Sequence, residues 1–324
     1  MKKTVGNAIL FLLLLGVLLS IVSWMFLPKD NSPEAGIDDV LSSGFLAEPA
    51  QTLDVLILGD SLPKFDVIPP VLWNQQGFPA YVCAAGGGTL PKVQEWAEEF
   101  FRKQTPKVVL LDTNLLTRDP APHYAAQLWL ERQLPVLRYH DNWKIVPPHR
   151  MLRKVNYTYC TWEKGYYLCK LIEPADGVEH YMEEEGEDIR ISQEEIAGIR
   201  QIEALCREHG SRLILLSLPD AFSMNKTRHN TLARLAEEIG IPYLDMNLED
   251  LGLDWSVDSA DGGDHLNYWG AKKVTQYLGT YLAQTDLLSD RRTDPAYEQW
   301  NLDYESFMDM AKAAVGNTLD TPDK

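Results

Sequence analysis

The residue types that could do chemistry in this chain are a serine, a histidine and several acids, all in short loops. Ser61 follows a short apolar run over residues 53–58 and the glycine at position 59. A strand that stops at a glycine and presents a serine can expose a nucleophile at the carboxyl edge of a parallel sheet. By itself the tripeptide Gly-Asp-Ser is as consistent with an ordinary polar turn, so the prediction depends on partners elsewhere in the sequence.

A serine hydroxyl scarcely ionises at neutral pH, so Ser61 needs a base. His265 is the natural candidate, because it lies in a Gly-rich segment from which its ring can point sideways into a cleft. A lone histidine is more often a surface or capping residue. The neighbouring loops favour the catalytic role, since they add acids and oxyanion donors, which acyl transfer through a serine also requires. Four loops fall at the same edge of the predicted sheet: 59–61, 86–88, 112–114 and 261–265.

From residue 53 onward, short apolar strands alternate with amphipathic helices. Such alternation predicts an α/β fold with three layers, in which a central parallel sheet is covered on both faces and ligands bind at the carboxyl ends of the strands. The predicted strands cover 53–58, 80–83, 107–112, 212–218 and 242–245, and the predicted helices cover 69–76, 91–104, 192–209, 227–239 and 268–283.

Three segments stand outside this alternation. Residues 28–52, rich in Pro, Gly, Ser and Asp, are predicted to be a flexible stalk. Residues 116–190 carry many aromatic residues and prolines and are interpreted as an inserted subdomain or lid. The segment 286–324 is interpreted as an acidic C-terminal tail with one helix around 297–314. The main domain is therefore expected over residues 53–285.

The N-terminal segment 1–27 is interpreted as an uncleaved membrane anchor. Residues 8–27 carry no charge, and a helix of this length is about 30 Å long, the thickness of a bilayer's hydrocarbon core. A cleaved signal peptide is the alternative, but the run is long for one and no Ala-x-Ala site follows it before Pro28. Lys2 and Lys3 precede the run and acidic residues follow it, which predicts a cytoplasmic N terminus and an extracytoplasmic domain.

Composition excludes several classes of function. The net charge of −17 argues against a nucleic-acid partner and against simple electrostatic docking on anionic lipid, although a local basic patch could exist. Cys160 and Cys169 could form a disulfide or remain free thiols. We expect no metal, because no Cys or His pairs have zinc-ligand spacing, and no cofactor: the glycines at 86–88 lack the Gly-x-Gly-x-x-Gly spacing of a dinucleotide site.

Over residues 53–115 and 192–284 the chain resembles the GDSL/SGNH hydrolase superfamily. Ser61, in Leu-Gly-Asp-Ser-Leu, is similar to the first block of that family, and Gly87 falls where the second block has its glycine, although Gly86 or Gly88 would fit almost as well. Asn114 is similar to the asparagine of the third block and His265 to the histidine of the last. The resemblance implies a flavodoxin-like fold. It also implies an oxyanion hole formed by the backbone N–H groups of Ser61 and Gly87 and the side chain of Asn114.

The sequence departs from the family pattern at two positions. Asp112 replaces the glycine of the third block, and Gly262 stands where the acid three residues before the histidine is usual. The acid of the triad is then Asp261 or Asp264, and Asp261 is preferred because adjacent side chains tend to point apart.

Within this superfamily, an anchored extracytoplasmic domain resembles bacterial proteins that complete the O-acylation of cell-envelope polymers. Such proteins work beside a multi-pass membrane acyltransferase. The expected function is therefore transfer of an acyl group, commonly acetyl, through Ser61 to a glycan hydroxyl. The alternatives are a carbohydrate or lipid esterase and a catalytically silent binding or scaffold subunit.

Overall fold

The structure, a computed structural model, describes residues 2–117, 123–183, 185–316 and 319. The chain divides into two compact units. The larger unit consists of residues 48–119 and 160–324 and contains the sheet, whereas the smaller unit consists of residues 1–47 and 120–159.

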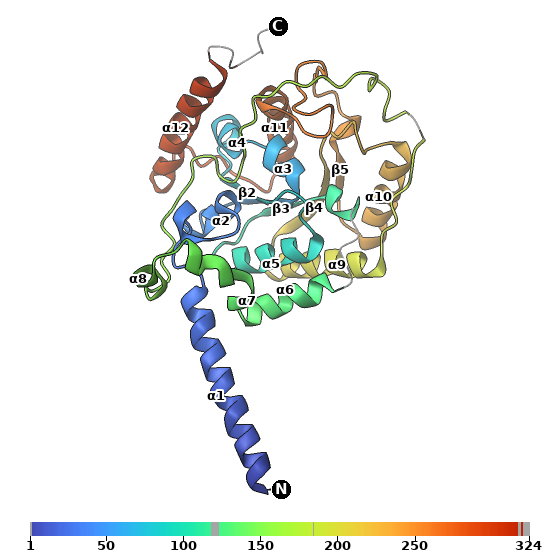
Figure 1. Cartoon of the computed structure of the whole chain (residues 1–324). Helices are drawn as coiled ribbons and strands as arrows, with labels where there is room; N and C mark the ends of the chain where they lie inside the picture. The colour runs from blue at the N-terminus through green and yellow to red at the C-terminus, as the bar shows by residue number, and fades with distance from the viewer. Residues whose placement is uncertain (1, 118–122, 184, 317–318, 320–324) are drawn as a thin grey trace. The chain divides into compact units, whose positions relative to one another are not determined.

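The described part of the larger unit contains one sheet of five parallel strands in the order β2-β1-β3-β4-β5 (Figure 1). This is the order of flavodoxin-like doubly wound sheets, so the predicted fold class is confirmed. The strands are β1 (Val55–Gly59), β2 (Ala80–Ala84), β3 (Val108–Asp112), β4 (Arg212–Ser217) and β5 (Tyr243–Asp245). The first three are buried along their whole length, which explains why their sequences are continuous apolar runs.

Helices cover both faces of the sheet (Figure 1). α3, α4 and α11 pack together against one face, and α5 and α9 pack together against the other. The helices of this unit are α3 (Ser61–Asp66), α4 (Pro69–Gln76), α5 (Leu90–Phe101), α9 (Gln193–Glu208), α10 (Lys226–Ile239), α11 (Tyr268–Ala283) and α12 (Glu298–Val315). The sequence pattern did not predict α3, the short helix that begins at Ser61 and follows β1.

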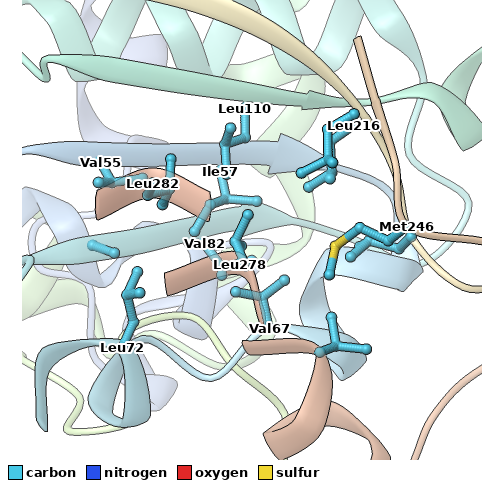
Figure 2. Close-up of a cluster of buried hydrophobic side chains, with 14 of the residues drawn as sticks. Val55, Ile57, Val67, Leu72, Val82, Leu110, Leu216, Met246, Leu278 and Leu282 are labelled. Carbon is cyan, nitrogen blue, oxygen red and sulfur yellow. The ribbon is translucent and has the colours of Figure 1, made fainter. Parts of the chain in front are cut away.

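The main core lies between the sheet and the face covered by α3, α4 and α11. Ile57 of β1 and Val82 of β2 lie beside Leu278 of α11 in this cluster, as Figure 2 shows. All three side chains are completely buried. Because β1 is an interior strand, paired with β2 and β3 and packed on both faces, the turn that follows it starts from a rigid position.

The segment 286–324, expected to be an acidic tail, forms part of this unit. α12 contacts α4, and Phe307 is completely buried in a cluster with residues of α4 and α11. Lys164 is 1% exposed and forms ion pairs with Glu48, at 2.6 Å, and with Asp303 of α12. The apolar residues of α12 therefore determine that this segment packs on the domain, despite its acidic composition. Residues 317, 318 and 320–324 of the expected tail lie outside the described residues.

The smaller unit contains the N-terminal helix and the first part of the insert. Its described helices are α1 (Lys2–Phe26), α2 (Val40–Ser43), α6 (Tyr124–Gln133), α7 (Val136–Tyr139) and α8 (Pro148–Met151), with the 3-10 helices η1 (Pro33–Ala35), η2 (Gly44–Leu46) and η4 (His140–Lys144). Among the described helices, α1 is the one long and apolar enough to cross a membrane, with a mean hydropathy of 2.7.

Residues 28–47 are ordered, although their composition suggested a flexible stalk. The side chain of Asn31 is completely buried. Its Nδ2 donates hydrogen bonds to the carbonyls of Ser43, at 3.2 Å, and Tyr159, at 2.8 Å, and its Oδ1 accepts one from the backbone N–H of Tyr159 at 3.0 Å. Composition could not reveal this clamp, because Tyr159 lies 128 positions away in the sequence.

The expected insert over 116–190 is divided between the two units. Residues 120–159 belong to the smaller unit and residues 160–190 to the larger one. There the backbone N–H of Val82 donates to the carbonyl of Lys164 at 3.0 Å, so the second half of the insert is anchored on the sheet domain. Cys160 and Cys169 are free thiols, the second of the two alternatives.

Candidate active site

Ser61 lies where the interior strand β1 turns into α3. Gly59 ends the strand, and a Cβ there would lie 2.4 Å from Pro63 and 2.7 Å from the Cβ of Asp112, so only glycine fits. Asp60 is the N-cap of α3, and its Oδ1 accepts a hydrogen bond from the backbone N–H of Leu62 at 3.1 Å. This tight turn presents Ser61 as the first residue of the helix, with 8% of its surface exposed.

The structure brings Ser61 and His265 into hydrogen-bond contact. Nε2 of His265 lies 2.7 Å from Oγ of Ser61, and Nδ1 of the same ring lies 2.6 Å from Oδ2 of Asp261. Oδ1 of Asp261 also accepts the backbone N–H of His265 at 2.8 Å. Oδ2 of Asp264 is 3.6 Å from Nδ1, beyond a good hydrogen bond. Of the two acids left open by the sequence, Asp261 is therefore the one that contacts the imidazole.

The loop that carries His265 is held by buried polar contacts. Oγ of Ser259 accepts the backbone N–H of Gly263 at 2.8 Å, and the N–H of Ala260 donates to the carbonyl of His265 at 2.9 Å. Asn267 caps α11, and its Nδ2 donates to the carbonyl of Val257 at 2.7 Å. These bonds close the loop into one compact turn, which fixes where the imidazole points.

Residues 164–175 run along the same loop. The backbone N–H of Gly262 donates to the carbonyl of Glu173 at 3.2 Å, and the N–H of Tyr167 donates to the carbonyl of Lys64 at 2.7 Å. The ring of Phe65 lies against both Tyr167 and His265, with centroids 5.1 Å and 4.8 Å apart. This part of the expected insert therefore forms one wall of the site.

The two loops expected to supply oxyanion donors also lie at this edge. Nδ2 of Asn114 donates to Oδ2 of Asp60 at 3.0 Å, which places the amide beside the turn that presents Ser61. A Cβ on Gly88 would lie 3.1 Å from the carbonyl oxygen of Gly59, so the glycine loop packs directly on that turn. Gly87 has φ +67° and is exposed. Within the described residues, the backbone N–H groups of Ser61 and Gly87 donate to no protein atom, as an oxyanion hole requires.

Four buried acids lie at or near the site, Asp60, Asp66, Asp112 and Asp220, and the sequence pattern assigned none of them a role there. Burial raises the pKa of Asp66 well above its usual range, and it does the same for Asp112, where the neighbouring charge of Asp60 adds to the effect. Burial also raises the pKa of Asp220 to about 6. For Asp66 the only sequence signal is an acid set among apolar residues, between Phe65 and Val67.

Asp261, Asp264 and His265 form a cluster whose ligand atoms lie within 4.8 Å of one another, so it could hold a metal ion. A metal on Nδ1 would have to replace the proton that this nitrogen shares with Asp261 at 2.6 Å. The short contact and the orientation of Nε2 toward Ser61 fit a histidine that is hydrogen-bonded to Asp261 and Ser61 better than a histidine that binds a metal ion.

The arrangement contains the parts of a serine acyl-transfer centre: a hydroxyl, an imidazole in contact with it, a carboxylate on the far side of the ring, and N–H donors beside the hydroxyl. Residues 59–61, 112–114 and 261–265 all contribute to it. These loops, which are distant in the sequence, lie together in the structure, and the catalytic roles expected of their residues remain predictions.

No family model matches the chain, and no curated protein matches it. Solved structures with a similar arrangement include a protein assigned as an acylhydrolase from Bacteroides fragilis, at 14% identity and a TM-score of 0.39, covering 76% of this chain and 96% of that one. A protein assigned as an SGNH hydrolase from Slackia heliotrinireducens has 11% identity and a TM-score of 0.40, covering 72% and 100%. An acetylxylan esterase from Geobacillus stearothermophilus has 12% identity and a TM-score of 0.33, covering 71% and 93%. At these sequence identities and TM-scores, the similarity supports no conclusion about the reaction. Any such conclusion depends on the side chains described above.

Proposed function

We propose that this chain is a membrane-anchored serine acyl-transfer enzyme of the SGNH type. The observation that carries the proposal is the continuous hydrogen-bonded series from Ser61 through His265 to Asp261, with contacts of 2.7 Å and 2.6 Å. A serine hydroxyl on a strand-to-helix turn has little reactivity without a base, and this contact supplies one. The reaction class follows from the residues themselves.

In the first half-reaction, Oγ of Ser61 attacks the carbonyl carbon of an acyl donor while Nε2 of His265 takes the hydroxyl proton. Asp261 holds Nδ1–H and stabilises the imidazolium that forms. The N–H groups of Ser61 and Gly87 and the amide of Asn114 stabilise the oxyanion. When the tetrahedral intermediate collapses, the imidazolium returns its proton to the leaving group, and the acyl group remains on Ser61.

In the second half-reaction, an acceptor hydroxyl enters beside His265. Nε2 removes its proton, the oxygen attacks the acyl carbon, and Ser61 leaves with the proton that the ring returns. A sugar hydroxyl as acceptor gives an O-acylated glycan. Water as acceptor gives hydrolysis through the same residues, so the ester hydrolase is the close alternative.

The proposed location depends on α1. Its exposed apolar surface suits a lipid environment, and Lys2 and Lys3 at its start favour a cytoplasmic N terminus by the positive-inside rule. The sheet domain would then lie on the extracytoplasmic side. An anchored domain there favours a cell-envelope glycan as acceptor and a multi-pass membrane acyltransferase as the source of the acyl group.

A transfer assay on the full-length chain separates the two activities. The purified protein is incubated with an acetyl donor and glycan oligomers, with Ser61→Ala as the matched control. The proposal predicts acetylated oligomers that the control does not produce. Free acetate without acetylated sugar would establish the esterase instead.

A catalytically silent scaffold is the third candidate, and two sequence departures favour it: Asp112 in place of a glycine and the shifted acid of the triad. The shift is compensated, because Asp261 contacts Nδ1 from its displaced position. Cells that retain full envelope function with Ser61→Ala would nevertheless establish a non-catalytic role.

A further inference from the structure

In the smaller unit, the segment that contacts the C-terminal end of α1 carries several exposed apolar side chains. Leu137, Trp143, Ile145, Leu152 and Val155 are 49%, 64%, 63%, 59% and 40% exposed. We call these five residues the apolar patch. A soluble surface seldom exposes two such large side chains as Trp143 and Ile145 so close together in the chain.

Two contacts attach the patch segment to α1, and a third attaches it to Lys29, shortly after the end of that helix. α7, which carries Leu137, contacts α1, and Figure 1 shows it beside the end of α1 that leads into the rest of the unit. Nδ2 of Asn142 donates to the carbonyl of Phe26, the last residue of α1, at 3.3 Å. The backbone N–H of Asn156 donates to the carbonyl of Lys29 at 2.8 Å. The patch therefore lies at one end of the apolar helix.

The burial profile of α1 is the one expected for a helix whose C-terminal end lies at a membrane surface. Residues 3–21 are exposed apart from one half-buried position, and burial by the protein begins at residues 22–23. An exposed stretch of this length measures about 28 Å at 1.5 Å per residue, close to the hydrocarbon thickness of a bilayer. The residues that contact α1 beyond position 21 would then lie at the level of the lipid headgroups.

Charge near the patch fits the same location. A surface cavity of about 520 Å³ is lined by Arg150, Arg153 and Lys154 together with two acids, Asp30 and Glu34. Lys29 also lines it but is 5% exposed, and its Nζ donates to the carbonyl of Trp24. Lys144, adjacent to Trp143, is also exposed and forms an ion pair with Asp141 at 2.7 Å. This local excess of positive charge contrasts with a net charge of −17 for the chain. Tryptophan and basic residues together are typical of segments that lie in the headgroup region.

We infer that the apolar patch inserts into the outer-leaflet interface of the bilayer that α1 crosses, with the neighbouring basic residues on anionic headgroups. This segment, 136–156, then serves as a second membrane contact. The inference rests on the part of the proposed function that makes α1 an uncleaved anchor. A single helix leaves the domain free to rotate and tilt, whereas a second contact restricts both.

The test measures the depth of Trp143 in the full-length chain reconstituted into bilayers with anionic lipid. The Trp143 signal is the difference in emission between the wild type and Trp143→Phe. Quenching is compared for lipids brominated near the headgroup, lipids brominated near the bilayer centre, and aqueous iodide. Trp96→Phe serves as the matched control, because Trp96 is 6% exposed and its signal should be shielded from both quenchers.

The inference predicts that shallow brominated lipid quenches the Trp143 signal severalfold more than deep brominated lipid does, and that iodide quenches it little. Strong quenching by iodide with none by brominated lipid would overturn it. Replacing Arg153 and Lys154 by Gln should reduce the shallow quenching in anionic but not in neutral bilayers. If alkaline carbonate released the whole chain from membranes, α1 would not be a membrane anchor. That result is distinct from one in which the chain stays in the membrane but Trp143 does not contact lipid.

Discussion

Oδ1 of Asp66 accepts a hydrogen bond from the backbone N–H of Leu266 at 3.0 Å, across 200 positions of sequence. Asp66 ends the helix that Ser61 begins, and Leu266 follows His265 directly. This buried contact therefore joins the element of the nucleophile to the loop of the base. Because both groups are removed from water, nothing replaces the bond when it is lost.

Replacing Asp66 by Ala should lower kcat by about 10-fold or more with little change in KM, since a misplaced imidazole affects the reaction more than binding. The free energy of unfolding should fall by about 1–3 kcal/mol, because the N–H of Leu266 loses its acceptor. Asp66→Asn keeps an oxygen acceptor and matches a protonated carboxyl, the form that burial favours. Steady-state kinetics of both variants checks this, and equal kcat for Asp66→Ala and wild type would contradict a positioning role.

The two acids beside His265 should differ sharply in importance. Asp261→Asn removes the charge that contacts Nδ1 and should reduce kcat by at least about 10²-fold. Because the side chain of Asp261 is 43% exposed, water screens its charge, and the loss should be smaller than the loss of a fully buried triad acid would cause. Asp264→Asn removes a carboxylate 3.6 Å from the ring and should cost less than about threefold. The ratio of the two kcat values is the measurement, and a larger loss for Asp264→Asn would reverse the assignment.

Asn114 should contribute to catalysis and not to binding. Its amide lies beside the serine turn, held by Asp60. Asn114→Ala should therefore lower kcat by about 10²–10³-fold, the usual cost of one oxyanion donor, with KM nearly unchanged. Thr113→Ser is the control, because its hydroxyl can still bond Ser217. A variant Asn114→Ala that raises KM alone would place the residue in substrate binding.

Asp220 should make stability depend on pH. Burial raises its folded pKa to about 6, above the value of a carboxyl in an unfolded chain, near 4. The folded state therefore holds this proton more tightly, and the stability that this gives is complete below about pH 4 and is lost as the pH rises through about 6. The loss amounts to at most about 3 kcal/mol.

The measurement compares thermal unfolding midpoints of the wild type and Asp220→Asn in detergent between about pH 4 and 7. Asp66 and Asp112 are present in both proteins, and because the charge of Asp220 helps to raise the pKa of Asp66, the difference reports Asp220 together with its effect on Asp66. The midpoint of Asp220→Asn should rise relative to that of the wild type across this range. Parallel curves would show that Asp220 ionises at the same pH in both states.

The sequence predicted the sheet, and it named most of the residues that lie together in the candidate site, because both depend on local patterns. A glycine after a buried strand identified the turn of Ser61, and the Gly-rich segment 261–265 identified the loop of His265. The five predicted strands were found with ends shifted by at most two residues, since apolar runs define strands well and their ends poorly.

What the sequence did not reveal depends on contacts between distant residues. The clamp of Asn31 on Tyr159 orders a segment whose composition suggested a stalk, and Lys164 connects α12 to the domain through Glu48 and Asp303. Asp66 and Asp60 were missed for the same reason, because their partners Leu266 and Asn114 lie far along the chain. Polar residues of this kind carry no periodicity that would indicate their partners.

The central claim is that His265 activates Ser61 as a nucleophile, and covalent labelling tests it most directly. The folded full-length chain is treated with a fluorophosphonate probe, and the modified peptide is identified by mass spectrometry. The account predicts one adduct, on Ser61, absent in Ser61→Ala and formed at least about 10²-fold more slowly in His265→Ala. No adduct on Ser61, or labelling at an equal rate in His265→Ala, would contradict it.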